Sequence, residues 1–410
     1  MNIIFLLMMT SLLISQSFMD LMSFVIIVTG LWSYRKKLHH ENHTFRFFKI
    51  GLEKLWIAWI FIWFLGIILA PTTSLEQGLS SAFAPTRIKA FLELKWILNF
   101  YFFVWFFYWL KPWKNLNWTW IWWALLLFSG YGIMGWIFDY DLIQQAPLSD
   151  PNRVGGLFDD PMTFAHVYSL FFILSFFVFL QKKDPLTGIS SLFSGIAVFL
   201  SMTRGVWAGV FISLLISLFI YRKKLAFIFL GLSTTAFAIL FLFWQRFHDR
   251  ILFMFDYSNN YDSERVWLWK ANFKIFMDHP LLGIGYGQYK FRLREYYDIL
   301  GAPISQFESH AHNQYLHFLA GTGALGLLCF LIFVGFNLYS GWQLIRLTKN
   351  TNLQTFAYGL FAAQISFLIG GLTESNFERA KVRWTYLVFT ALVLATIRSL
   401  QVDSRKGDRA

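Results

Sequence analysis

Three arginines of this chain have the side-chain type and the setting needed to bind a phosphorylated substrate. Arg204 lies in the segment SMTRGVWAG between two apolar stretches, where an arginine without a partner costs at least about 2.5 kcal/mol in a membrane. Arg153 and Arg265 lie in connections that we expect on the same side. Because the planar guanidinium fork matches phosphate oxygens, the three residues predict a clamp for a diphosphate.

His312 is the candidate catalytic residue. It lies in the segment SHAHNQYLHFLAGTGALG, where a long polar connection runs into an apolar stretch. An imidazole that is neutral near pH 7 can take a proton from a hydroxyl group. A diphosphate is already a good leaving group, so positioning and charge stabilisation would suffice to move a group from a lipid diphosphate to an alcohol.

Each of these four residues also has a purely structural interpretation. Arg204 would extend its charge to the membrane interface, and Arg153 would pair with one of three nearby aspartates. Arg265 would be a solvated helix residue that follows the N-cap Ser263. His312 would cap a helix or pack in the core.

The nearby histidines raise the possibility of a metal site. His310 and His312 are two residues apart and would diverge on a helix, and no third Cys or His ligand follows at the usual spacing. We therefore expect no metal and no other cofactor. His317 falls on a different helix face from His312, and we expect it to pack.

The composition indicates where these residues work. The chain has 410 residues, of which 57% are hydrophobic and only 14% are charged, whereas soluble domains carry about 25% charged residues. Apolar stretches near the length that crosses a bilayer recur at 3–15, 18–33, 51–70, 93–110, 118–138, 162–181, 186–203, 205–221, 225–244, 316–340, 354–372 and 384–400. We predict an all-α polytopic membrane protein with about twelve transmembrane helices in a single domain, 1–410. The first two stretches meet at Asp20 and form either one span or two.

The distribution of Lys and Arg predicts the orientation. With a cytoplasmic N-terminus, the inside segments hold 19 basic and five acidic residues, and the outside segments hold 16 and 17. This excess places both termini in the cytoplasm. The inside Lys and Arg residues are spread over six short segments. We therefore interpret them as loop anchors among membrane lipids, and they do not predict nucleic-acid binding.

The longest polar connection, 245–315, lies outside between the ninth and tenth predicted helices. Residues 263–278 have the pattern of an interfacial amphipathic helix, and a second helix is expected at about 288–299. Structureless connections of this length are usually functional. Because this connection contains both Arg265 and His312, we predict that it forms a lid over the site. A basic cluster at Arg379, Lys381 and Arg383 would form ion pairs or contact lipid headgroups.

Four motifs resemble those of the O-antigen ligase family and occur along the chain in the family's order. His312-Asn313, nine residues, Gly323, two residues and Gly326 fit the family's His-Asn…Gly-x2-Gly pattern. SMTRG is similar to its Ser-Arg-Gly turn, and SERVWLWKANFKIFMDHPLLGIGYG to its Arg-x3-Trp-x2-Ala…Pro-x2-Gly-x-Gly stretch. NRVGGLFDDPMTFA is similar to its Arg-x2-Gly-x-Phe segment. The resemblance covers about 150–330, and residues before 140 match only in hydropathy.

The resemblance implies a metal-independent, inverting glycosyltransferase of the bacterial inner membrane, with its active site facing the periplasm. It implies an undecaprenyl-diphosphate-linked glycan as donor and lipid A–core as acceptor. His312 would then deprotonate the acceptor hydroxyl, and Arg204 and Arg265 would bind the diphosphate. Arg153 would be a further substrate-binding residue.

Related activities stay open at this point. O-antigen polymerases, protein O-oligosaccharyltransferases and exopolysaccharide ligases share these motifs. We favour the ligase because the chain is compact and its long connection comes late in the sequence. A lipid-linked glycan transporter is a more remote alternative, because the sequence has no evident internal repeat and few charges near the centres of the apolar stretches.

Overall fold

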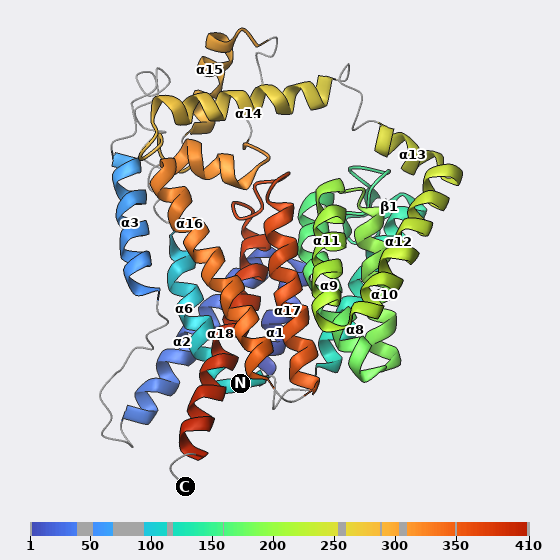
Figure 1. Ribbon diagram of the computed structural model, residues 1–410, viewed down its shortest axis with the longest axis vertical. Helices are drawn as coiled ribbons and strands as arrows, with labels where there is room; N and C mark the ends of the chain where they lie inside the picture. The colour runs from blue at the N-terminus through green and yellow to red at the C-terminus, as the bar shows by residue number, and fades with distance from the viewer. Residues whose placement is uncertain are drawn as a thin grey trace.

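The computed structural model describes residues 2–38, 52–68, 94–112, 118–158, 160–252, 260–287, 289–302, 310–348 and 351–407. A helix lies on each of the twelve predicted apolar stretches (Figure 1), which confirms the all-α fold. These helices are α1 (Asn2–Ile14), α2 (Gln16–Leu38), α3 (Glu53–Ile68), α6 (Lys95–Leu110), α8 (Thr119–Phe138), α9 (Pro161–Lys182), α10 (Pro185–Leu200), α11 (Arg204–Tyr221), α12 (Lys223–Phe243), α16 (Gln314–Leu347), α17 (Thr351–Gly370) and α18 (Ala380–Gly407).

Length and composition establish fewer spans than the sequence predicted. Within the described ranges, seven helices are long and apolar enough to cross a membrane: α8, α9, α11, α12, α16, α17 and α18. Three shorter apolar helices lie at Ile3–Ile14, Ser17–Thr29 and Pro185–Leu200. The chain is a membrane protein, and the number of twelve spans stays a prediction.

The first apolar region is divided beside the gap between the predicted stretches 3–15 and 18–33, and not at Asp20. The break between α1 and α2 lies at Ser15, whose hydroxyl oxygen accepts a hydrogen bond from the Phe18 amide at 3.1 Å. A serine satisfies the amides that a new helix leaves without partners. Asp20, the expected boundary, lies inside α2.

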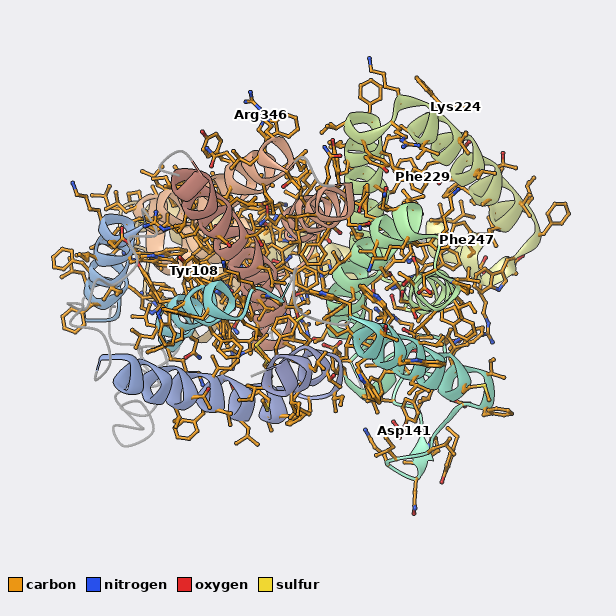
Figure 2. The ribbon with its side chains drawn as sticks, turned by 90° about the horizontal axis from the view of Figure 1, so that it is seen from below. Tyr108, Asp141, Lys224, Phe229, Phe247 and Arg346 are labelled. Carbon is orange, nitrogen blue, oxygen red and sulfur yellow. The ribbon has the colours of Figure 1, made fainter. Side chains whose placement is uncertain are left out.

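Small residues let the central helices approach closely. α17 packs against both α9 and α11, and α18 packs against α6. A Cβ on Gly209 of α11 would lie 2.8 Å from the Ser366 carbonyl oxygen of α17, so only glycine permits this backbone contact. By contrast, α12 lies at the edge of the molecule in Figure 2. Only 6% of its apolar 18-residue segment is buried, as expected for a lipid-facing helix.

The long connection folds across one end of the bundle. It contains α13 (Gln245–Leu252), α14 (Asn260–Asp278), the 3-10 turn η2 (Tyr289–Arg292) and α15 (Leu293–Leu300). α14 includes the predicted helix 263–278, whereas the second α-helix begins five residues later than expected because η2 precedes it. Figure 1 shows these elements at the end of the molecule opposite the two termini. The arrangement agrees with termini on one side, and the cytoplasmic assignment stays a prediction.

Part of this long connection packs against a break in helix α16. Gly323 has φ +64° inside the helix, and a Cβ there would overlap the Leu281 backbone. The Ala324 amide donates to the Pro280 carbonyl oxygen at 2.8 Å. Gly283 has φ +63°, and a Cβ there would lie 2.6 Å from the α16 backbone. The glycines of two separate motifs therefore form one docking contact.

A small hairpin that the sequence did not predict follows α8. Strands β1 (Tyr140–Asp141) and β2 (Ala146–Pro147) pair antiparallel, with Asp141 opposite Ala146. The Asp141 carboxylate accepts hydrogen bonds from the Ile143 and Gln144 amides, both at 2.8 Å. Figure 2 shows this hairpin at the periphery of the molecule.

Candidate active site

The site lies at the start of α16, and Asn313 determines its position. The Asn313 Oδ1 caps the helix by accepting from the Tyr315 and Leu316 amides, both at 3.0 Å. Its Nδ2 donates to the Leu372 carbonyl oxygen at 3.0 Å. The asparagine of the His-Asn motif therefore attaches the start of α16 to the connection between α17 and α18, residues 371–379.

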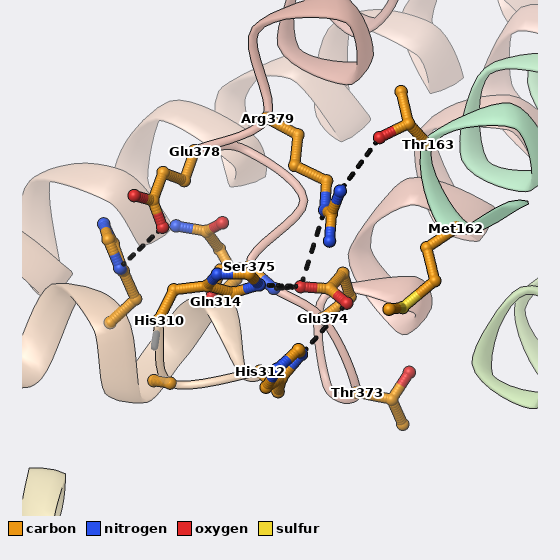
Figure 3. A network of polar contacts seen from close by, with 12 residues as sticks. Met162, Thr163, His310, His312, Gln314, Thr373, Glu374, Ser375, Glu378 and Arg379 are labelled. Carbon is orange, nitrogen blue, oxygen red and sulfur yellow. Dashed lines mark hydrogen bonds and ion pairs between the residues drawn. The ribbon is translucent and has the colours of Figure 1, made fainter. Parts of the chain in front are cut away.

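Glu374 of that connection contacts two histidines. His310 Nε2 lies 2.6 Å from Oε1, and His312 Nδ1 lies 3.1 Å from Oε2 (Figure 3). The Ser375 amide also donates to Oε1 at 3.0 Å. Glu374 is only 2% exposed. Buried carboxylates of this kind need hydrogen-bonding partners, and Glu374 has three.

The charges of this group favour a neutral histidine beside an ionised carboxylate. Burial alone would raise the pKa of Glu374, but hydrogen bonds from His310 and His312 and the Arg379 charge hold that pKa well below its usual range. Burial lowers the pKa of His312 below 6.5, although the Glu374 hydrogen bond opposes this shift. With the proton on Nδ1 directed at Glu374, the lone pair that can accept a proton lies on Nε2.

The expectation that His310 and His312 diverge is wrong. Both residues precede the helix, and His312 has a left-handed φ of 44°. Their ring centroids are 4.3 Å apart. Two imidazole nitrogens and the Glu374 carboxylate lie within 4.8 Å of one another, and this donor set suits a metal ion.

Arg265 comes to the site from the opposite end of the long connection. Trp269, one turn further along α14, donates from Nε1 to the Ala311 carbonyl oxygen at 3.0 Å. The Arg265 charge contributes to the lowered pKa of His312. Arg265 and His312, predicted separately as site residues, therefore lie near each other.

Arg204 begins α11 beside the same connection. A Cβ on Gly205 would overlap the Thr373 side chain, so this glycine permits direct packing next to Glu374. Arg204 is half-buried there. α9, α16 and α18 also begin at this end of the bundle (Figure 1). Helix N-termini carry partial positive charge and favour anions.

Arg153 has a different position from the other two predicted arginines. Its Nε donates to the Ser201 carbonyl oxygen at 2.8 Å, and its Nη2 donates to Thr203 Oγ1 at 3.0 Å. Nη1 lies 3.8 Å from an Asp150 carboxylate oxygen. The Arg153 side chain thus fixes the turn that leads into Arg204. The nearby Asp159 lies outside the described residues.

Arg379 connects Glu374 to the start of α9. Its Nη1 contacts the Asp160 carboxylate. The same nitrogen lies 3.0 Å from Thr163 Oγ1, and the Arg379 Nε lies 3.7 Å from Glu374 Oε1 (Figure 3). Burial would raise the pKa of Asp160, but Arg379 and local hydrogen bonds lower it. The ion-pair interpretation of the basic cluster is therefore right for Arg379. Arg383 is 2% exposed, so the headgroup interpretation is wrong for that residue.

A second polar network attaches the long connection beside His312. Tyr289 of η2 accepts from the Ala311 amide at 3.1 Å, and its hydroxyl lies 2.6 Å from His317 Nδ1. Lys290 forms an ion pair with Glu378. His317 is fully buried, which confirms that it packs. The connection predicted to act as a lid is thus bonded to both α16 and the α17–α18 connection.

Comparison with known proteins supports the resemblance found in the sequence. Residues 189–331 match the model of the O-antigen ligase family. The matched segment includes Arg204, Arg265 and His312, whereas Arg153 and Glu374 lie outside it. No curated protein matches the chain.

Proposed function

We propose that this chain is a glycosyltransferase of the O-antigen ligase type. It moves a glycan from undecaprenyl diphosphate to a hydroxyl group of lipid A–core at the periplasmic face of the bacterial inner membrane. The observation that carries this proposal is His312, bonded through Nδ1 to the buried Glu374 and placed near Arg265. The family match supports a membrane enzyme of the ligase or polymerase type.

The proposed reaction is a single displacement. Nε2 of His312 takes the proton of the acceptor hydroxyl while its oxygen attacks the anomeric carbon of the glycan. The bond from that carbon to the diphosphate breaks, and the diphosphate leaves with the electron pair. Attack from the opposite side inverts the anomeric configuration. Glu374, a positioning residue, holds the imidazole and stabilises its protonated form.

The arginines and helix ends would bind the diphosphate. Arg204 and Arg265 supply guanidinium groups for the donor and stabilise the charge that grows on the leaving group. Arg153 acts through the turn that it bonds, where it positions Arg204. Because the leaving group is good and these cations neutralise it, the reaction needs no metal cofactor.

A polymerase or a protein O-oligosaccharyltransferase would use the same chemistry with another acceptor. Deletion of the gene and inspection of the lipopolysaccharide separates these activities. A ligase leaves lipid A–core without polymer while lipid-linked polymer accumulates. Core that carries a single repeat indicates a polymerase, and unchanged lipopolysaccharide with altered glycoprotein indicates a protein glycosyltransferase.

Transfer by the purified protein separates an enzyme from a lipid-linked glycan transporter. We expect detergent-solubilised protein to transfer glycan from the lipid diphosphate. His312→Ala should lower the rate by about 10²–10⁴-fold, the contribution of a general base. The variant should keep the wild-type thermal unfolding midpoint. Wild-type transfer by the variant would refute the role of His312 as the base.

A further inference from the structure

The cluster of His310, His312 and Glu374 offers more than a base and its partner. His310 Nε2 and His312 Nδ1 both point at one carboxylate, at 2.6 and 3.1 Å from its two oxygens. Glu374 and His312 are buried, whereas His310 is half-buried. A general base needs only one of these two histidines, so the base role leaves His310 unexplained.

The donor set matches one class of ion. Two imidazole nitrogens and one carboxylate form a common three-ligand site for Zn²⁺, with a fourth position for water. The ligand atoms already lie within 4.8 Å of one another, so small side-chain movements would bring them around one ion.

The surrounding charges limit the affinity. Arg379 Nε lies 3.7 Å from Glu374 Oε1, and the Arg265 charge also acts on His312. Both cations oppose a divalent ion, so binding should be weaker than at a structural zinc site. We therefore expect an ion to enter and leave this site reversibly.

We propose that His310, His312 and Glu374 bind a divalent transition-metal ion, such as Zn²⁺, and that the bound ion inhibits glycan transfer. The binding part stands on the geometry of the cluster alone. The inhibition part rests on the proposed function, because it requires His312 to act as the base.

Inhibition follows from the tautomers of His312. When Nδ1 binds the ion, the proton of the neutral imidazole moves to Nε2. The Nε2 lone pair that would accept the hydroxyl proton is then absent. Glu374 also becomes a metal ligand and no longer stabilises a protonated imidazole. The ion therefore removes the base while it leaves the diphosphate-binding arginines in place.

Metal binding is tested with Co²⁺, whose visible spectrum reports its ligands. Three other histidines near the N-terminus, His39, His40 and His43, could bind metal by themselves. The full-length protein should therefore carry Gln at these three positions throughout. We expect one Co²⁺ per chain, displaced by Zn²⁺.

Variants identify the ligands. His310→Ala, His310→Gln and Glu374→Gln should each weaken Co²⁺ binding by about tenfold or more, since even indirect partners of metal ligands contribute this much. His279→Ala, which changes a histidine at the end of α14, is the matched control and should leave binding unchanged. Unaltered binding in the cluster variants, or no binding by the parent protein, overturns the proposal.

Transfer assays test inhibition separately. Zn²⁺ should inhibit reversibly, with EDTA restoring the rate. His310→Ala should raise the half-inhibitory zinc concentration about tenfold, relative to its own zinc-free rate. Binding without inhibition, or a metal-stripped protein that needs zinc for activity, overturns the inhibitory role. If the parent protein transfers no glycan under any condition, the proposed function fails and the Co²⁺ spectra alone decide the metal site.

Discussion

The imidazole of His312 and the carboxylate of Glu374 work as a pair because each sets the protonation of the other. Burial lowers the pKa of His312, and the Glu374 hydrogen bond partly offsets that effect. The histidine is consequently neutral at pH 7, while its partner is ionised. A neutral base next to a fixed negative charge is suited to accept a proton and to hold it briefly.

Glu374→Gln tests this pair through the pH profile. Removal of the charge takes away the interaction that raises the pKa of His312, so the pKa falls further. The acid limb of kcat/KM, which reports a base in the free enzyme, should lie below pH 6.5 and move lower in the variant. The plateau rate should fall by about 10²-fold or more, because the imidazolium loses its stabilising charge. An unmoved acid limb would show that Glu374 has a merely structural role.

Lysine substitutions test the two guanidinium groups proposed to bind the diphosphate. Arg204→Lys and Arg265→Lys keep the charge but lose the planar fork. We expect KM for the lipid-diphosphate donor to rise about tenfold in each, the effect of one charge-assisted hydrogen bond. Arg294→Lys, on the exposed face of α15, is the control. Donor binding at wild-type affinity in both site variants would exclude the clamp.

The residues whose type alone suggests chemistry could be predicted from the sequence. Those that act through tertiary contacts with other residues could not. Arg265 and His312 were predicted from their settings, and the structure brings them together. Glu374 was not singled out, because its partners His310 and His312 lie 64 and 62 positions away in the chain. No local spacing encodes such a contact. In the sequence, Glu374 is distinguished only as an acidic residue in a short connection between apolar stretches.

At the scale of elements, helix α16 links the candidate site at its start to the long connection, which packs at its break. The N-terminal part of the helix bears Asn313 as its cap, and the break at Gly323 receives the segment 280–283. The same connection contributes Arg265 and the Tyr289 hydroxyl next to His312. The position of the connection and the position of His312 are therefore coupled through one helix.

Gly323→Ala tests whether this docking is needed. A left-handed backbone costs a residue with a Cβ about 1–3 kcal/mol, and the added methyl would also overlap the Leu281 backbone. We expect a lower unfolding midpoint and a lower transfer rate. Gly335→Ala is a matched control in the same helix, because its Cβ would meet nothing within 4 Å. Equal behaviour of the two variants would contradict the docking role.

The helices were predictable from hydropathy, whereas their interruptions were not. In lipid, an apolar stretch must form its backbone hydrogen bonds within itself, as a helix does. Each of the twelve predicted apolar stretches carries a helix. The breaks depend on tertiary contacts instead. Gly323 lies inside the predicted stretch 316–340, and its break is stabilised by residues about 40 positions earlier. By contrast, the break at Ser15 adjoins the gap between the predicted stretches 3–15 and 18–33.

At the scale of the whole molecule, charge and geometry agree on two distinct ends. The described parts of three predicted outside connections, 139–161, 245–315 and 373–383, lie at the end that bears α14 and α15, and both termini lie at the other (Figure 1). The inside segments carry the large excess of Lys and Arg. In a membrane this asymmetry orients the protein. The candidate site would then face the periplasm, where its proposed substrates meet.

Cysteine labelling tests this orientation. Cys329→Ser removes the single native cysteine, which is buried. Gln144→Cys, in the exposed β1–β2 hairpin, should react in intact spheroplasts with a maleimide that cannot cross membranes. Lys182→Cys, at the exposed end of α9, should react only after the membrane is opened. The reverse pattern would place His312 in the cytoplasm and exclude transfer to a periplasmic acceptor, whereas labelling of both sites from outside would contradict the path of α9 across the membrane.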